Sequence, residues 1–79
     1  MNNKRRKEID VIIERLDELI QTIEDLQEQE EDALDNVPES LQESERAETM
    51  QDSISELENS IDSLNEAKSA LEMAQGSAG

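Results

Sequence analysis

The chain has 79 residues, a formal net charge of −15, and no Phe, Tyr, Trp, Cys or His. A chain this short buries only a modest part of its surface, so we expect one small domain that gains stability by association. The missing residue types exclude disulfides, thiolate zinc sites, imidazole catalysis and aromatic stacking platforms.

The charge is unevenly distributed along the sequence. The first 15 residues contain five of the basic side chains, whereas from Leu16 onward only Arg46 and Lys68 oppose 19 carboxylates. Such a surface repels nucleic acid and anionic membranes, so we expect neither to bind directly. The basic Lys4–Lys7 segment is interpreted more simply as a solubilising end that pairs with acidic side chains of a neighbouring subunit. No apolar run approaches the roughly 18 residues of a membrane span, so we expect a soluble, cytoplasmic protein.

Residues 4 to about 35 predict the first helix. Six apolar residues alternate spacings of three and four, the pattern of a coiled-coil seam: Ile9, Ile12, Leu16, Leu19, Ile23 and Leu26. Ile13, Ile20 and Leu34 lie beside this seam and widen the apolar stripe to the breadth typical of a helical bundle. Glu30 interrupts the pattern, so we expect the seam to loosen near the end of this helix.

A hinge that reverses the direction of the chain is predicted over residues 36–44. Pro38 lacks a backbone N–H and disfavours helical geometry at Val37, so the first helix should stop near Asn36. Ser40 followed by Glu43 forms a candidate capping box, and Ser44 is the better candidate N-cap for the second helix.

The second helix is expected from about 45 to 74, followed by a flexible tail at 76–79. Its seam continues the alternation, with Lys68 interrupting it, through Ala47, Met50, Ile54, Leu57, Ile61, Leu64 and Leu71. Ser53, Ser60, Ala67 and Ala74 recur every seven residues and form a ridge of small side chains beside that seam. Lys68 either directs its ammonium group to solvent or meets a carboxylate such as Glu30 or Glu8 across an interface.

These elements predict an all-α fold: a single domain over residues 1–75, formed by an antiparallel hairpin of two long helices. One hairpin leaves part of its apolar stripe exposed, so we expect a homodimer in a four-helix bundle, or a higher homo-oligomer. The expected oligomer core consists of Ile9, Ile12, Ile13, Leu16, Leu19, Ile20, Ile23, Leu26, Met50, Ile54, Leu57, Ile61, Leu64 and Leu71.

Catalytic and metal-binding motifs are missing from the sequence. The absence of histidine excludes the Glu-x-x-His pairs of di-iron bundles, and the carboxylates lack the spacing and central glycine of an EF-hand loop. No phosphate-binding, dinucleotide-binding or nucleophile-elbow pattern occurs. We therefore expect no catalytic residues, no metal, no cofactor and no enzyme activity.

The hinge sequence Asn36-Val37-Pro38-Glu39-Ser40-Leu41-Gln42, followed by Ser44-Glu45-Arg46, is the most distinctive stretch. It resembles the linker of short acidic helical-hairpin proteins carried by phages, prophages and mobile elements. The resemblance spans the whole hairpin and implies a genomic setting rather than an activity. A weaker likeness is to the dimeric helical hairpins of type VII secretion, but the Trp-x-Gly hinge of that family is absent here.

The hinge has two interpretations. In the structural one, Ser40 and Ser44 cap helices, Leu41 closes the core, and Arg46 pairs with Glu43 or Glu39. In the functional one, the hinge forms a polar end that binds a ligand or partner, because Arg46 is the only basic residue between Leu16 and Ala67 and a helix N-terminus at Ser44 favours an anion. Its candidate binding residues are Asn36, Gln42, Ser44 and Arg46, with Lys68 as a further candidate.

Three functions remain open from the sequence. The first is a non-enzymatic interaction protein that occupies the basic surface of a host defence or nucleic-acid-binding protein, as a DNA mimic does. The second is an oligomer that sequesters a small anionic ligand, such as a nucleotide signal, with Arg46, Ser44, Lys68 and the basic N-terminus as phosphate contacts. The third is a purely structural assembly module that binds only itself.

Overall fold

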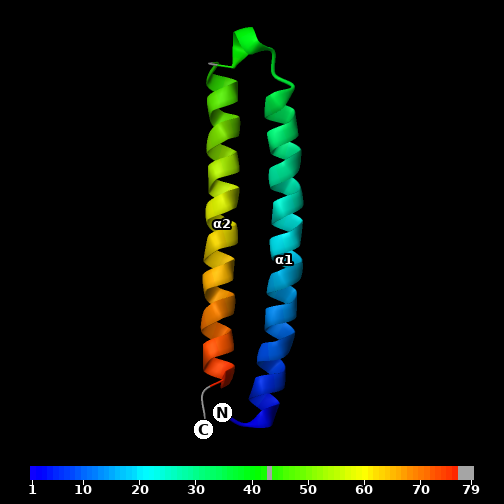
Figure 1. Cartoon of the computed structure of the whole chain (residues 1–79), viewed down its shortest axis with the longest axis vertical. Helices are drawn as coiled ribbons and strands as arrows, with labels where there is room; N and C mark the ends of the chain where they lie inside the picture. The colour runs from blue at the N-terminus through cyan, green and yellow to red at the C-terminus, as the bar shows by residue number, and fades with distance from the viewer. Residues whose placement is uncertain (43, 77–79) are drawn as a thin grey trace.

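The computed structural model describes residues 1–42 and 44–76. Two long helices, α1 (Asn3–Asp35) and α2 (Glu45–Gly76), are joined through a short 3-10 helix, η1 (Glu39–Leu41). The long helices run antiparallel, side by side (Figure 1), and the Cα positions extend over 60 × 15 × 11 Å. The expected all-helical architecture, in which two long helices pack against each other, is confirmed.

Side-chain caps define the start of each long helix. The Asn2 Oδ1 accepts a hydrogen bond from the backbone N–H of Arg5 at 2.9 Å, and α1 therefore begins one residue before the expected position 4. The Ser44 Oγ accepts a hydrogen bond from the N–H of Ala47 at 3.3 Å, the interaction expected of an N-cap. Both caps satisfy N–H groups that have no partner within their own helix.

Short local hydrogen bonds reverse the chain at the hinge. Beyond the end of α1, the N–H of Val37 donates to the carbonyl of Leu34 at 3.0 Å, and the N–H of Leu41 donates to the carbonyl of Pro38 at 2.8 Å. The expected capping box of Ser40 with Glu43, and the expected Arg46–Glu43 pair, both involve a residue outside those described. Of the expected tail at 76–79, only Gly76 is described, and it lies within α2.

The two helices pack through a seam of alternating three- and four-residue spacing on each. On α1, the buried or partly buried residues of the seam are Ile9, Ile13, Leu16, Ile20, Ile23, Gln27, Glu30 and Leu34, and Arg6, also partly buried, continues the spacing. On α2, the seam residues are Ala47, Met50, Ile54, Leu57, Ile61, Leu64, Lys68, Leu71 and Gln75, and Ser60 and Ala74 beside them are also only partly exposed. The α2 seam is the one expected from the sequence, with Lys68 interrupting it.

The α1 seam differs from the expected one. Ile12, Leu19 and Leu26, which were expected within the seam, are 44%, 53% and 48% exposed, and Ile13, Ile20 and Leu34 face α2 in their place. The apolar stripe of α1 is wider than one neighbouring helix can cover, so one edge packs and the other edge stays in solvent. Which edge packs depends on how the hinge directs α2, and the spacing alone does not determine it.

Three contacts across the seam, made by the side chains of Lys68 and Gln75, set the register of the helices. The Lys68 Nζ lies 2.7 Å from the Asp17 Oδ1, and the Gln75 Nε2 donates to the Arg6 carbonyl at 2.9 Å and also to Asp10. Residue 20 of α1 is therefore nearly level with residue 64 of α2, close to the middle of the rod. We call residues 20–64 the hinge half, and the remainder of the chain the terminal half.

Candidate interaction surfaces

The hairpin has two broad faces, and they differ in chemistry. Two antiparallel helices lying in one plane are related by a half-turn about the normal to that plane, so equivalent seam positions on both helices turn toward the same face. The Lys68–Asp17 and Gln75–Asp10 contacts each join an α2 seam residue to the α1 residue that follows a seam position, so Asp10 and Asp17 lie on the same broad face as Lys68 and Gln75.

The first broad face, which we call the apolar face, is formed by residues that immediately precede every second seam residue. They are Ile12, Leu19, Leu26 and Ala33 on α1, with Ser53, Ser60, Ala67 and Ala74 on α2. From Ile12 to Ala33 and from Ser53 to Ala74 this set contains no charged residue, and Arg46, which precedes seam residue Ala47, continues it at the hinge end. It brings three half-exposed large side chains next to the ridge of small side chains expected from the sequence. A contiguous exposed apolar surface is a candidate site of association.

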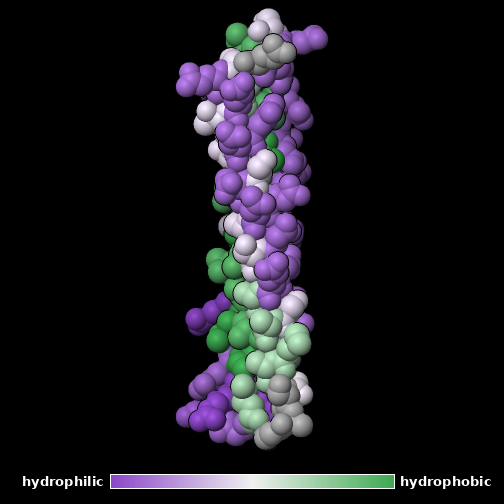
Figure 2. All heavy atoms as spheres, turned by 90° about the vertical axis from the view of Figure 1, so that its left-hand side faces the viewer, coloured by the Kyte–Doolittle hydropathy of each residue, from purple (hydrophilic) through white to green (hydrophobic). Residues whose placement is uncertain are grey.

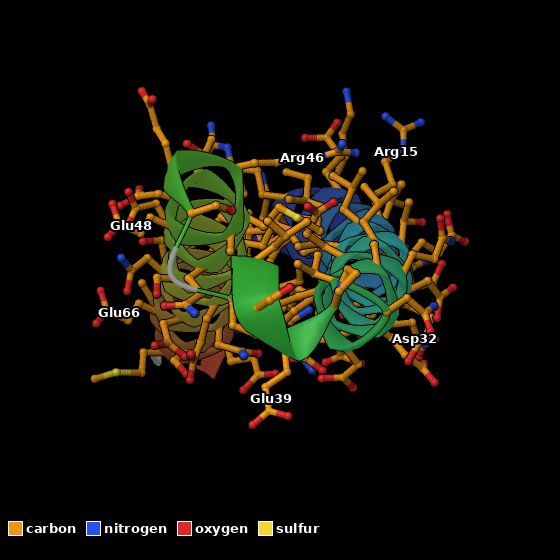
Figure 3. The ribbon with its side chains drawn as sticks, turned by 90° about the horizontal axis from the view of Figure 1, so that it is seen from above. Arg15, Asp32, Glu39, Arg46, Glu48 and Glu66 are labelled. Atoms are coloured by element: carbon orange, nitrogen blue, oxygen red, sulfur yellow. The ribbon has the colours of Figure 1, made fainter. Side chains whose placement is uncertain are left out.

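The opposite broad face, which we call the acidic face, is formed by the residues that follow the alternate seam positions. All eight are exposed: Asp10, Asp17, Glu24 and Glu31 on α1, with Gln51, Glu58, Asn65 and Glu72 on α2. Figure 3, which views the rod from its hinge end, shows Arg15 and Arg46 projecting on one side of the helix pair and Glu39 of η1 on the other, with Asp32, Glu48 and Glu66 at the flanks. The two broad faces therefore differ in composition, while further carboxylates lie along the flanks.

Charge and hydropathy also differ along the rod. The hinge half carries 15 carboxylates against Arg46 alone, a net charge of −14, whereas the terminal half carries seven carboxylates against six basic residues, a net charge of −1. On the α2 side of the rod, which faces the viewer in Figure 2, apolar residues gather over the terminal half and polar residues cover most of the hinge half. The negative field of the protein is thus concentrated at one end.

The hinge residues predicted to bind a ligand are engaged in capping. The Gln42 Nε2 donates to the carbonyls of Val37 at 2.7 Å and Leu34 at 3.2 Å, and so satisfies groups that α1 leaves unpaired at its end. Ser44 caps α2, and the backbone N–H of Asn36 donates to Asp32 at 3.1 Å. The side chain of Asn36 is exposed.

Arg46 and Lys68 do not share a site. They lie on one helix with 22 residues between their positions, a separation of roughly 33 Å at 1.5 Å per residue. Lys68 is paired with Asp17, not with Glu30 or Glu8, and that pairing raises the pKa of Lys68 through the hydrogen bond and the attraction of the carboxylate. Arg46 is exposed beside the apolar face and makes no ion pair with another described residue.

Several functional features were not predicted from the sequence. The exposure of Ile12, Leu19 and Leu26, the capping by Gln42 and the Lys68–Asp17 pair all depend on the direction and register of the second helix. The Asn2 cap was also missed, although asparagine directly before a helix is a recognisable signal.

Within residues 1–42 and 44–76 there is no pocket and no cluster of three side chains able to hold a metal ion. Neither long helix contains, in its described part, a stretch apolar enough to cross a membrane. Comparison with known proteins found no matching family model, curated protein or solved structure.

Proposed function

We propose that this chain is a non-enzymatic interaction protein whose hinge half binds the basic surface of a nucleic-acid-binding protein. The observation that carries this proposal is the separation of charge along the rod. Half of the 60 Å length holds a net charge of −14, which is one negative charge per roughly 2 Å, close to the spacing of about 1.7 Å along duplex DNA.

The geometry of the helices supports contact with an extended basic groove. Thirteen of the 15 carboxylates of the hinge half lie on α1 or α2, so their spacing is held by backbone hydrogen bonds and does not have to be ordered upon binding. Electrostatic complementarity of this kind accelerates encounter and weakens with ionic strength. The resemblance of the hinge to phage and prophage hairpins points to a host defence or nucleic-acid-binding protein in the cytoplasm as the partner.

The proposal includes self-association into a four-helix bundle, because one hairpin leaves Ile12, Leu19 and Leu26 half exposed. A dimer keeps both highly charged hinge halves available for partners while removing the apolar face from water. The proposed protein is therefore an acidic rod that assembles with itself through one face and binds its partner through charge.

The test is binding to a panel of purified DNA-binding proteins with basic grooves, measured by calorimetry at several salt concentrations and in competition with duplex DNA. We expect at least one partner whose affinity falls steeply with salt and from which DNA displaces the hairpin. Salt-independent binding, or binding that persists in a ternary complex with DNA, would contradict a DNA-like mode.

A matched pair of variants locates the binding surface. Glu48→Gln, Asp52→Asn and Glu56→Gln combined remove three exposed charges from the hinge half, whereas Glu8→Gln, Glu14→Gln and Glu18→Gln combined remove three from the terminal half. We expect the first variant to lose at least several-fold more affinity than the second. Equal losses would assign the binding to overall net charge.

A further inference from the structure

We infer that the occupant of the apolar face is a second copy of this chain, lying antiparallel to the first, so that the hinge end of each hairpin meets the terminal end of the other. The inference rests on the self-association included in the proposed function and adds its surface and orientation. It follows from three features of the described residues: the size of the face, its symmetry and the position of the charges.

The broad side of the rod that carries the apolar face is large enough for a stable dimer. Between Cα positions this whole side measures 60 Å by 15 Å, an outline of about 900 Å², against the roughly 800 Å² that each partner contributes to a standard interface. The apolar face covers roughly the central 32 Å of its length, at 1.5 Å per residue. Ser60, which lies in this face, already donates its hydroxyl to the Leu57 carbonyl at 2.7 Å. Its polar group is therefore satisfied when the face is covered.

The same face is symmetric about the middle of the rod. On α1, the three large residues of the face are centred on Leu19, midway between Ile12 and Leu26, with the small Ala33 beyond them; on α2 the small ridge from Ser53 to Ala74 is centred near residues 63 and 64. These two centres are nearly level in the hairpin. A single two-fold axis through them places α1 against α1 and α2 against α2, with Ile12 opposite the partner's Leu26 and Leu19 opposite the partner's Leu19.

Charge selects the antiparallel orientation. In that arrangement the basic segment at Lys4 and Arg5 lies beside Asp32 and Asp35 of the partner subunit. In the parallel arrangement two hinge halves with net charge −14 lie side by side, and the basic segment faces described residues 73–76, which contain no carboxylate side chain. Attraction in the first case and repulsion in the second favour the antiparallel dimer.

In this dimer the large residues of α1 pack against those of the other α1, and the small residues of α2 pack against those of the other α2. The leucine and isoleucine side chains of the two α1 helices interdigitate, while the serine and alanine ridge lets the two α2 helices approach closely. The acidic faces remain on the outside of the dimer. Each end of the resulting bundle combines one acidic hinge half with one nearly neutral terminal half.

The first test measures mass and orientation. Light scattering coupled to size exclusion is expected to give twice the 8.9 kDa chain mass. The chain has no cysteine, so Ser40→Cys carries a single spin label at the hinge; electron-electron resonance should then give a label separation near the 60 Å length of the rod. A monomer, or labels within roughly 20 Å of each other as two adjacent hinges require, would overturn the inference.

The second test uses variants at one level of the rod. Leu19→Glu introduces a charge into the centre of the apolar face, and Asn65→Glu introduces the same side chain nearly level with it on the acidic face. We expect Leu19→Glu to weaken dimerisation at least a hundred-fold while circular dichroism shows retained helix, and Asn65→Glu to change it by less than ten-fold. Equal effects of the two variants would place the interface elsewhere.

These outcomes are independent of partner binding. A monomer that still binds a basic protein in a salt-dependent manner would overturn the antiparallel dimer and leave the hinge-half binding intact. An antiparallel dimer that binds no basic protein would support the inferred dimer and overturn the proposed hinge-half binding.

Discussion

The hinge half and the terminal half are packed along the same seam but differ in what α1 contributes to it. In the terminal half α1 contributes Ile9, Ile13 and Leu16, whereas in the hinge half Ile20 and Ile23 are followed by Gln27 and Glu30 before Leu34 closes the end. Toward the hinge the packing therefore depends more on α2, on capping by Gln42 and on the covalent connection. The difference shows that the seam of one hairpin can change from apolar to partly polar along its length.

The largest expected effect tests the terminal half. Ile9 is 9% exposed and is one of the three most buried apolar residues described, so Ile9→Ala should lower the free energy of unfolding by about 2–5 kcal/mol through lost burial and a cavity. Urea denaturation followed by circular dichroism, at a fixed protein concentration, measures the loss. Gln27→Ala is the matched seam variant in the hinge half, and a loss as large as that of Ile9→Ala would remove the contrast between the halves.

A smaller loss is expected from overpacking at the hinge. Ala47 is completely buried in the first turn of α2, so Ala47→Leu should destabilise the hairpin by about 1–3 kcal/mol, because no space is left for the added methyl groups. The same substitution at exposed Ala33, on the apolar face, should leave the hairpin intact and strengthen self-association. Thermal unfolding and sedimentation of both variants distinguish these effects; a tolerated Ala47→Leu would contradict close packing at the hinge.

An effect of opposite sign is expected at the polar part of the seam. Glu30 is partly buried at a seam position in the most acidic part of the protein. Glu30→Leu should raise the free energy of unfolding by about 1 kcal/mol, because it adds apolar burial and removes a like charge. The test compares the free energies of unfolding of Glu30→Leu and Glu31→Leu, measured by urea denaturation; Glu31→Leu is the control at an exposed position on the acidic face. A destabilised Glu30→Leu would show that the glutamate makes a favourable interaction in the seam.

The smallest effect concerns the ion pair of the terminal half. The hydrogen bond and attraction from Asp17 raise the pKa of Lys68 above its ordinary value of 10.5. The stabilisation is therefore fully present below that value and is lost as the pH rises through the pKa of the folded state. The thermal midpoint should fall more between pH 9 and 11.5 in the wild-type protein than in Lys68→Met, which lacks the ion pair. An equal fall of the thermal midpoint in the two proteins would mean that the Lys68–Asp17 pair does not contribute to stability.

Much of the fold could be predicted from particular residues. Pro38 and Val37 locate the turn because proline ends a helix, Ser44 starts the second helix because its hydroxyl accepts a backbone hydrogen bond, and the spacing from Ala47 to Leu71 identifies the packed side of α2. The candidate site was predicted less well. Gln42 has a polar side chain of the kind found at binding sites, but its amide donates hydrogen bonds to the backbone carbonyls of Leu34 and Val37.

The sequence by itself determined two long helices, a reversal near Pro38 and an excess of carboxylates, because propensity, capping and charge act over a few neighbouring residues. Only the tertiary structure decided that Ile13 and Ile20 pack while Ile12 and Leu19 stay half exposed, and that Lys68 meets Asp17. Both outcomes depend on the rotation and register of one helix against the other. A wide apolar stripe is compatible with several such arrangements, so the apolar and acidic faces emerge only when the second helix is in place.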